Sequence, residues 1–148
     1  MKIQACRLQN AAWPTILCID DDPQISETIG LRLNQYDVNV ISACHGMHGF
    51  WLAMTNRPGL VITDVNMPQG AGDYVVDCLR RNSDTHEIPI IVLTGQRDSQ
   101  LESRMRHCGA DEYFIKPVYF DKLRDAILKY IPLKERNWNE VRTMTRQN

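Results

Sequence analysis

Residues 15–23 of this chain read Thr-Ile-Leu-Cys-Ile-Asp-Asp-Asp-Pro, and they are the most informative stretch for the fold. A mostly apolar run is followed at once by three carboxylates and a proline. Asp22 is suited to cap a helix and Pro23 to occupy its first turn, ahead of apolar residues at helical spacing. The stretch therefore predicts a buried strand that ends on acidic residues and leads directly into a helix.

Polar residues follow apolar runs at three further places along the chain. Asp64, Thr94 and Lys116 each come directly after a short, mostly apolar segment. Parallel α/β sheets carry their chemistry at the carboxyl ends of the strands, in the crevice at a topological switch point. We therefore expect these three side chains to meet the acidic run at one edge of a sheet.

Strand-like and helix-like segments alternate along the whole chain. This alternation predicts an α/β fold of five βα units, a doubly wound five-stranded parallel sheet with helices on both faces, as in a flavodoxin-like three-layer sandwich. Runs 60–63 and 88–93 are nearly all apolar, which favours central strands. The expected strands are 15–19, 38–42, 60–63, 88–93 and 112–115, and the expected helices are about 24–35, 47–56, 72–82, 98–108 and 119–131.

The two ends of the chain lie outside this unit. We expect an N-terminal extension at 1–13, one domain at 14–131 and a C-terminal tail at 132–148. In the tail, Trp138 and two later apolar residues have helical spacing, which leaves a short added helix and a frayed tail as alternatives.

The composition narrows the class of protein. Lys and Arg number 17 against 18 for Asp and Glu, so a nucleic-acid surface has no support from charge. No apolar stretch approaches the roughly 20 residues that span a bilayer, and no signal peptide precedes the domain. The five cysteines are odd in number and widely spaced. These features predict a soluble, cytoplasmic protein that binds neither nucleic acid nor membrane.

Taken singly, each polar residue has an ordinary structural explanation. An acidic triplet before proline is commonly a helix cap, and Asp64 could be a turn former. Together, however, the carboxylates would repel one another unless a cation neutralised them, and Mg²⁺ suits such a site. A carboxylate such as Asp64 can attack phosphorus, while Lys116 and Thr94 can contact the phosphoryl oxygens. The combination therefore indicates phosphoryl transfer.

Four motifs carry a resemblance to a known family: residues 16–23 already quoted, Asp-Val-Asn-Met-Pro at 64–68, Leu-Thr-Gly at 93–95, and Gly-Ala-Asp-Glu-Tyr-Phe-Ile-Lys-Pro at 109–117. Over about residues 14–131 the chain resembles the receiver domain of bacterial two-component response regulators, the relatives of the chemotaxis protein CheY. The loop after Pro68 departs from the family pattern, which leaves the start of the third helix uncertain and not the chemistry.

The resemblance implies a role for each site residue. Asp64 would be the phosphoacceptor, with Lys116 and Thr94 contacting the phosphoryl group. Tyr113 would be the aromatic switch that turns inward when the Thr94 hydroxyl moves to the phosphate. The bond before Pro117 is often cis in this family. The implied Mg²⁺ ligands are Asp20 (largely through water), Asp21, Asp64 and the backbone carbonyl of Asn66.

The function expected from this resemblance is that of a single-domain response regulator. A sensor histidine kinase or histidine phosphotransferase would supply the phosphoryl group, and the face near 97–131 would bind an unknown output protein or a second copy. Such a protein catalyses only its own phosphorylation and dephosphorylation, so it is not an enzyme in the ordinary sense. The alternatives are a phosphorylation-independent scaffold, a receiver fragment of a larger regulator, and a small Mg²⁺-dependent phosphotransferase. An FMN carrier of the same fold is disfavoured, because the acidic first loop would repel the FMN phosphate.

Overall fold

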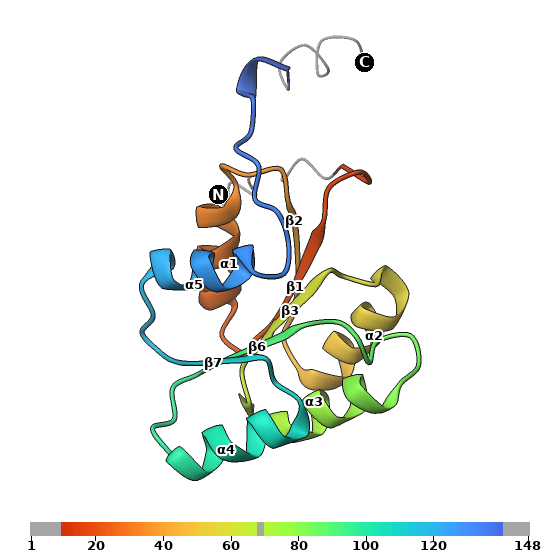
Figure 1. Ribbon diagram of the computed structural model, residues 1–148, viewed down its shortest axis with the longest axis vertical. Helices are drawn as coiled ribbons and strands as arrows, with labels where there is room; N and C mark the ends of the chain where they lie inside the picture. Colours follow the sequence, from red (N-terminus) through yellow and green to blue (C-terminus); the bar gives the residue numbers. More distant parts are fainter. Residues whose placement is uncertain (1–9, 68–69, 141–148) are drawn as a thin grey trace.

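Strands and helices alternate along the chain as the sequence predicts, and the expected fold class is confirmed (Figure 1). The computed structural model describes residues 10–67 and 70–140. Its elements are β1 (Thr15–Ile19), α1 (Pro23–Leu33), β2 (Asn39–Ala43), α2 (Gly46–Asn56), β3 (Leu60–Thr63), β4 (Asn66–Met67), β5 (Gly70–Ala71), α3 (Gly72–Arg81), β6 (Ile90–Thr94), α4 (Ser99–Cys108), β7 (Glu112–Ile115) and α5 (Phe120–Leu128).

Five strands form one parallel sheet in the order β2-β1-β3-β6-β7. The chain first steps outward from β1 to β2 and then returns past β1 to β3, so the direction of winding reverses between β1 and β3. Ligand sites of open α/β sheets lie at such a switch point, beside the carboxyl ends of the strands. The topology therefore marks the ends of β1 and β3 as the place to look for chemistry.

Helices cover both faces of the sheet, as Figure 1 shows. Helices α2, α3 and α4 pack on one face over a core that includes Leu79 and Met105. Helices α1 and α5 pack on the other face over a core that includes Leu33 and Ile127. Because both faces are buried, β3 and β6 carry no exposed residue.

The predicted helix boundaries hold where a capping residue sets them. Asp22 caps α1 by accepting a hydrogen bond from the Gln24 N–H, and Pro23 occupies the first turn. Asp98 caps α4 in the same way, and Gly109 ends α4 in the left-handed conformation, with φ at 113°. These residues therefore start and stop their helices through local hydrogen bonds that the sequence already specifies.

Three strand assignments differ from the expected ones. Strand β2 runs from Asn39 to Ala43, one residue later than expected. Strand β6 begins at Ile90 and not at residue 88, because Pro89 has no N–H to donate to a neighbouring strand. The loop after Asp64 contains a small antiparallel hairpin, β4 with β5, that the sequence did not predict.

Helix α5 and the segment after it also differ from the expected pattern. Helix α5 ends at Leu128, and single turns continue to Ile131. In the tail, a helical turn begins at 138–140, and the remainder lies outside the described residues. Within the described part of the chain, no helix has the length and apolar character that a membrane crossing requires.

Candidate phosphoryl-transfer site

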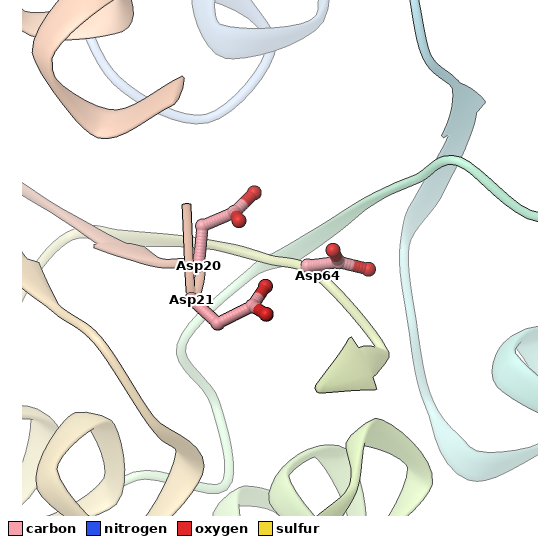
Figure 2. A group of neighbouring side chains, drawn as sticks. All are labelled: Asp20, Asp21 and Asp64. Atoms are coloured by element: carbon pink, nitrogen blue, oxygen red, sulfur yellow. The ribbon is translucent and has the colours of Figure 1, made fainter. Parts of the chain in front are cut away.

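Three acidic side chains come together at the switch point of the sheet. Asp20 follows β1 and Asp64 follows β3, and the Asp64 N–H donates to the Ile19 carbonyl at 2.8 Å, which extends the strand pairing up to the site. One carboxylate oxygen from each of Asp20, Asp21 and Asp64 lies within 4.8 Å of the other two (Figure 2). Asp20 and Asp64 are buried, whereas Asp21 is exposed.

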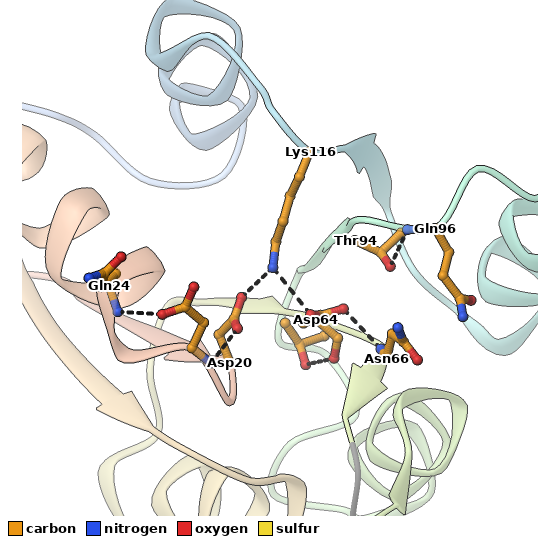
Figure 3. A network of polar contacts seen from close by, with 9 residues as sticks. Asp20, Gln24, Asp64, Asn66, Thr94, Gln96 and Lys116 are labelled. Atoms are coloured by element: carbon orange, nitrogen blue, oxygen red, sulfur yellow. Dashed lines mark hydrogen bonds and ion pairs between the residues drawn. The ribbon is translucent and has the colours of Figure 1, made fainter.

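Short backbone contacts orient these carboxylates. The Asp22 N–H donates to Asp20 Oδ1, and the Asn66 N–H donates to Asp64 Oδ1, both at 2.9 Å. The carboxylate of Asp22 accepts from the Gln24 N–H instead, so it caps α1 and does not join the cluster (Figure 3). Each buried carboxylate is therefore held by the residue two positions after it.

Lys116 follows the edge strand β7 and brings one positive charge to the acidic cluster. Its Nζ donates to Asp20 Oδ2 at 2.6 Å and to Asp64 Oδ2 at 3.2 Å (Figure 3). The Lys116 N–H donates to the Thr94 carbonyl at 2.8 Å, which ties the end of β7 to the end of β6. The bond to Pro117 is cis, in agreement with the family pattern.

The electrostatics of the site show a shortage of positive charge. Burial raises the pKa of Asp20 above its usual value, although the hydrogen bond from Lys116 opposes the rise. Burial by itself would lower the pKa of Lys116, but the Asp20 hydrogen bond and the charge of Asp64 raise it overall. Lys116 thus pairs with two of the three clustered carboxylates, and an additional cation would lower the free energy of this arrangement.

The donor set fits a hard divalent cation. Carboxylate oxygens from three side chains within 4.8 Å of one another can reach one ion with small rotations. Mg²⁺ prefers oxygen ligands, accepts a few carboxylates and keeps several of its waters. Asp21 is exposed, so this side of the acidic cluster is open to water. The acidic cluster is thus suited to Mg²⁺, as the sequence predicted.

Thr94 lies at the end of β6, on the opposite side of Asp64 from Asp20 (Figure 3). Its side chain is buried, and its Oγ1 accepts a weak hydrogen bond from the Gln96 N–H at 3.3 Å. Sequence reasoning did not single out Gln96, although its place two residues after Thr94 in a strand-end loop is a signal that could have found it. The long contact leaves the hydroxyl of Thr94 available to donate elsewhere.

Tyr113 is turned into the domain. The residue is 8% exposed, packs within the core under α2, α3 and α4, and its hydroxyl has no hydrogen-bond partner among the described residues. Burial raises the pKa of the Tyr113 hydroxyl, and the charges of Glu102 and Asp98 raise it further. The ring therefore occupies the inward position here, at the cost of leaving one buried polar atom unsatisfied.

The structure thus brings Asp20, Asp21, Asp64 and Lys116 into one cluster, with Thr94 beside it, while the ring of Tyr113 in β7 is buried in the core. The role of the Asn66 carbonyl as a metal ligand stays a prediction, because the described contact of Asn66 is the one its N–H makes to Asp64. Two histidines, His45 and His48, also lie close together in the sequence, but they form no part of this acidic cluster. His45 instead caps α2, where its Nδ1 accepts from the His48 N–H at 3.2 Å.

Comparison with protein families gives one match over most of the chain. The family model described as "Response regulator receiver domain" matches residues 16–128. This range contains the acidic cluster, Lys116, Thr94 and Tyr113, and it ends at the last residue of α5.

Curated relatives are between 27% and 36% identical to this chain over the aligned residues. The DNA-binding dual master transcriptional regulator RpaA of Synechocystis is 36% identical over 110 residues, which are 74% of this chain but 46% of that protein. Sporulation initiation phosphotransferase F of Bacillus subtilis is 29% identical over 120 residues, 80% of this chain and 94% of that protein. The chain therefore spans about half of one relative and nearly all of the other.

Solved structures agree with the sequence comparison. The chemotaxis protein CheY4 of Vibrio cholerae superposes with a TM-score of 0.75 at 25% identity, over 81% of this chain and 100% of that one. A response regulator from Chloroflexus aurantiacus superposes with a TM-score of 0.73 at 28% identity, over 78% of this chain and 94% of that one.

Proposed function

This chain belongs to the family of response regulator receiver domains, and on that premise we propose that Asp64 accepts a phosphoryl group from a phosphohistidine. The observation that carries the proposal is the position of Lys116 Nζ, shared between Asp20 Oδ2 and Asp64 Oδ2. A lysine held against a nucleophilic carboxylate is placed to meet the charge that develops on a transferred phosphoryl group.

The proposed step is an in-line displacement. An oxygen of Asp64 attacks phosphorus, the bond between phosphorus and the donor imidazole nitrogen breaks, and an acyl phosphate forms. The leaving imidazole keeps the electron pair and takes a proton from solvent. Attack by water on the acyl phosphate later returns the carboxylate and releases phosphate.

Asp20, Asp21, Asp64 and the Asn66 carbonyl would hold Mg²⁺. The ion, when bound, neutralises charge on the phosphoryl oxygens and on the carboxylates around them. Asp20 is the residue that favours such an ion most clearly, because burial already disfavours its charged form. Asp21, being exposed, leaves room for the waters that Mg²⁺ retains.

We further propose that phosphorylation acts as a switch through Thr94 and Tyr113. The Thr94 hydroxyl would leave its weak contact with Gln96 and donate to a phosphoryl oxygen, with Lys116 pairing with another. The space beside Thr94 is open, since a Cβ built on Gly95 would meet no atom within 4 Å. The inward position that the Tyr113 ring already occupies would then be stabilised further, which biases the packing of α4, β7 and α5.

The donor is proposed to be a sensor histidine kinase or a histidine phosphotransferase. A hollow of about 470 Å³ opens beside Lys116, between α1 and the loop that leads into α5. Its lining is largely apolar and includes Ile25 and Val118, and the neighbouring Tyr119 is 82% exposed. A donor that packs here would present its imidazole next to Asp64. We propose that the encounter takes place in the cytoplasm, which the odd number and wide spacing of the cysteines support.

The output side of the proposal is protein contact. The face formed by α4, β7 and α5, near residues 97–131, is the proposed surface for an output protein or a second copy. The DNA binding in the name of RpaA is a property of that protein, of which this chain spans less than half. A receiver within a larger regulator is therefore an alternative that the same site chemistry supports.

The proposal is tested with the purified chain, acetyl phosphate or beryllium fluoride, and Mg²⁺. Intact mass and ¹⁹F NMR should show an adduct that Asp64→Asn abolishes and that the matched surface variant Asp125→Asn retains. A folded wild-type protein with no adduct dependent on Asp64 would exclude the phosphoacceptor role and leave the scaffold alternative. Turnover of free phosphate esters, dependent on Asp64, would instead favour the small phosphotransferase.

A further inference from the structure

Arg136 is a buried cation outside the phosphoryl-transfer site. Its side chain is 2% exposed. The guanidinium carbon lies 4.5 Å from the ring centroid of Trp13 and 5.2 Å from that of Trp138. Distances below about 6 Å are those at which a cation is attracted to an aromatic face. The guanidinium is therefore in contact with two indole rings that come from opposite ends of the chain.

Hydrogen bonds fix the guanidinium to the turn between α1 and β2. One terminal nitrogen donates to Asn34 Oδ1 at 2.9 Å, and the other donates to the Tyr36 carbonyl at 2.7 Å. Nε has no hydrogen-bond partner among the described residues, and it lies 3.7 Å from Asp37 Oδ1. A buried charge is costly unless it is paired and covered, so this arrangement depends on every group around it.

The backbone on either side of Arg136 is also attached to that turn. The Arg136 N–H donates to the Gln35 carbonyl at 2.7 Å, and the Asp37 N–H donates to the Lys134 carbonyl at 2.8 Å. Tyr36 and Glu135 form an antiparallel bridge between these bonds. The segment 134–136 therefore lies against the α1–β2 turn like a short added strand.

Trp13, the N-terminal residue that contacts Arg136, is held in place by hydrogen bonds of its own segment. Asn39, buried at the start of β2, accepts from the Asn10 N–H at 3.0 Å and donates to the carbonyls of Asn10 at 2.7 Å and Trp13 at 3.2 Å. These bonds place the indole of Trp13 where Arg136 meets it. The N-terminal segment therefore forms part of the surface on which the C-terminal segment rests.

A helical turn, residues 138–140, starts two residues after Arg136. Asn137 caps it, accepting from the Asn139 N–H and donating to Glu140 Oε1, both at 3.1 Å. Trp138, the first residue of that turn, is one of the two indoles on Arg136. The direction in which the chain leaves the domain is thus coupled to the position of the guanidinium.

We propose that Trp13, Arg136 and Trp138 form a clasp that joins the two terminal segments and fixes the direction in which the chain leaves the receiver. The clasp lies at the amino end of the strands, because Trp13 precedes β1 and Asn34 follows α1, whereas the acidic cluster follows the opposite ends of β1 and β3. Through the clasp, residues 10–13 and 133–138 become part of the folded domain. The position of each segment depends on the position of the other.

Proteolysis of the full chain tests this clasp. Trypsin must take an arginine side chain into its pocket, so cleavage after Arg136 requires the clasp to open. Trp13→Ala should raise the rate of that cleavage, followed by mass spectrometry, by at least about tenfold, because one face of the guanidinium is uncovered. Asn34→Ala should raise it as well. Trp51→Ala removes an exposed indole from α2 and should change the rate by less than about twofold.

The fluorine NMR signal of Trp138 provides a second measurement, which does not require Trp13→Ala to be stably folded. In protein labelled with 5-fluorotryptophan, the Trp138 resonance is assigned with Trp138→Phe. Arg136→Lys keeps the charge but loses the paired N–H donors, and it should move the Trp138 resonance toward that of free 5-fluorotryptophan. Equal cleavage rates in Trp13→Ala and Trp51→Ala, or a Trp138 resonance that Arg136→Lys leaves unmoved, would overturn the proposal.

Discussion

Lys116 Nζ lies 3.2 Å from Asp64 Oδ2, although 52 residues separate them in the chain. The lysine follows the edge strand β7, and Asp64 follows β3, with β6 between them. The side chain of Lys116 also reaches Asp20, which follows β1. One amine thus pairs with the proposed nucleophile and with a proposed metal ligand before any phosphoryl group arrives.

Replacing Lys116 should therefore impair phosphoryl transfer more than folding. Lys116→Met removes the positive charge that meets the developing charge on the phosphoryl oxygens, a loss that commonly slows a reaction by about 100-fold or more. The rate of adduct formation with acetyl phosphate measures the effect, and the exposed Lys122→Met is the matched control. A rate in Lys116→Met equal to that of the control would contradict the proposed role.

Asp20→Asn should stabilise the protein without Mg²⁺ and abolish its response to Mg²⁺. Since the pKa of Asp20 is raised in the folded state, its ionised form is disfavoured there. This destabilisation is present above the folded pKa and is relieved as the pH falls through it. The neutral side chain of Asn removes this destabilisation. The Tm at neutral pH should therefore rise by roughly 3 °C for each kcal/mol added to the free energy of unfolding.

Thermal melts of Asp20→Asn with and without Mg²⁺ provide the measurement, because an ion that binds only the folded state raises Tm. Asp125→Asn, at a side chain that is 70% exposed, serves as the control and should behave like the wild type. If Mg²⁺ raised the Tm of Asp20→Asn as much as that of the control, Asp20 would not be part of a metal site.

Tyr113→Phe should leave stability unchanged or raise it by up to about 1 kcal/mol. The hydroxyl is buried without a partner, so deleting it removes an unsatisfied polar atom and keeps the packing of the ring. Tyr113→Ala should instead cost about 3 kcal/mol through the cavity it leaves. Urea unfolding of the two variants compares these effects. A loss above about 1 kcal/mol in Tyr113→Phe would mean that the hydroxyl is bonded.

Glu112 should give a pH-dependent contribution to stability. Its pKa is lowered mainly by the hydrogen bond from Lys129, at 2.6 Å, so the interaction stabilises the fold above the unfolded pKa and is lost as the pH falls through the folded pKa. Lys129 is 59% exposed, which limits the effect to below about 1 kcal/mol. Glu112→Gln should therefore be less stable than wild type at neutral pH, with the difference vanishing in acid.

Denaturant unfolding across the pH range measures the contribution of Glu112. Glu87→Gln, at a side chain that is 89% exposed, is the matched control and should show no comparable change. A destabilisation of Glu112→Gln that persisted below the folded pKa would assign it to lost packing and not to the charge.

Much of the fold was predictable because its signals are local. Buried strands are apolar along their length, and Asp22, Asp98 and Gly109 bond to backbone groups within a few residues of themselves, so their effects can be recognised in a short stretch of sequence. The β4–β5 hairpin was not predictable in the same way. Its two-residue strands are too short to show a periodic pattern.

The order of the five sheet strands and their helices, the acidic strand ends and the family resemblance could all be inferred from the sequence, since each depends on residues close together in the chain. Only the tertiary structure decided that one lysine bonds two carboxylates, that the Tyr113 ring is buried with its hydroxyl unpartnered, and that Arg136 is enclosed by Trp13 and Trp138. The contacts of Lys116 with Asp20 and Asp64, and of Arg136 with Trp13, join residues far apart in the sequence, and the burial of Tyr113 depends on helices packed over its strand. They form only when the sheet brings the strand ends together, so no local pattern records them.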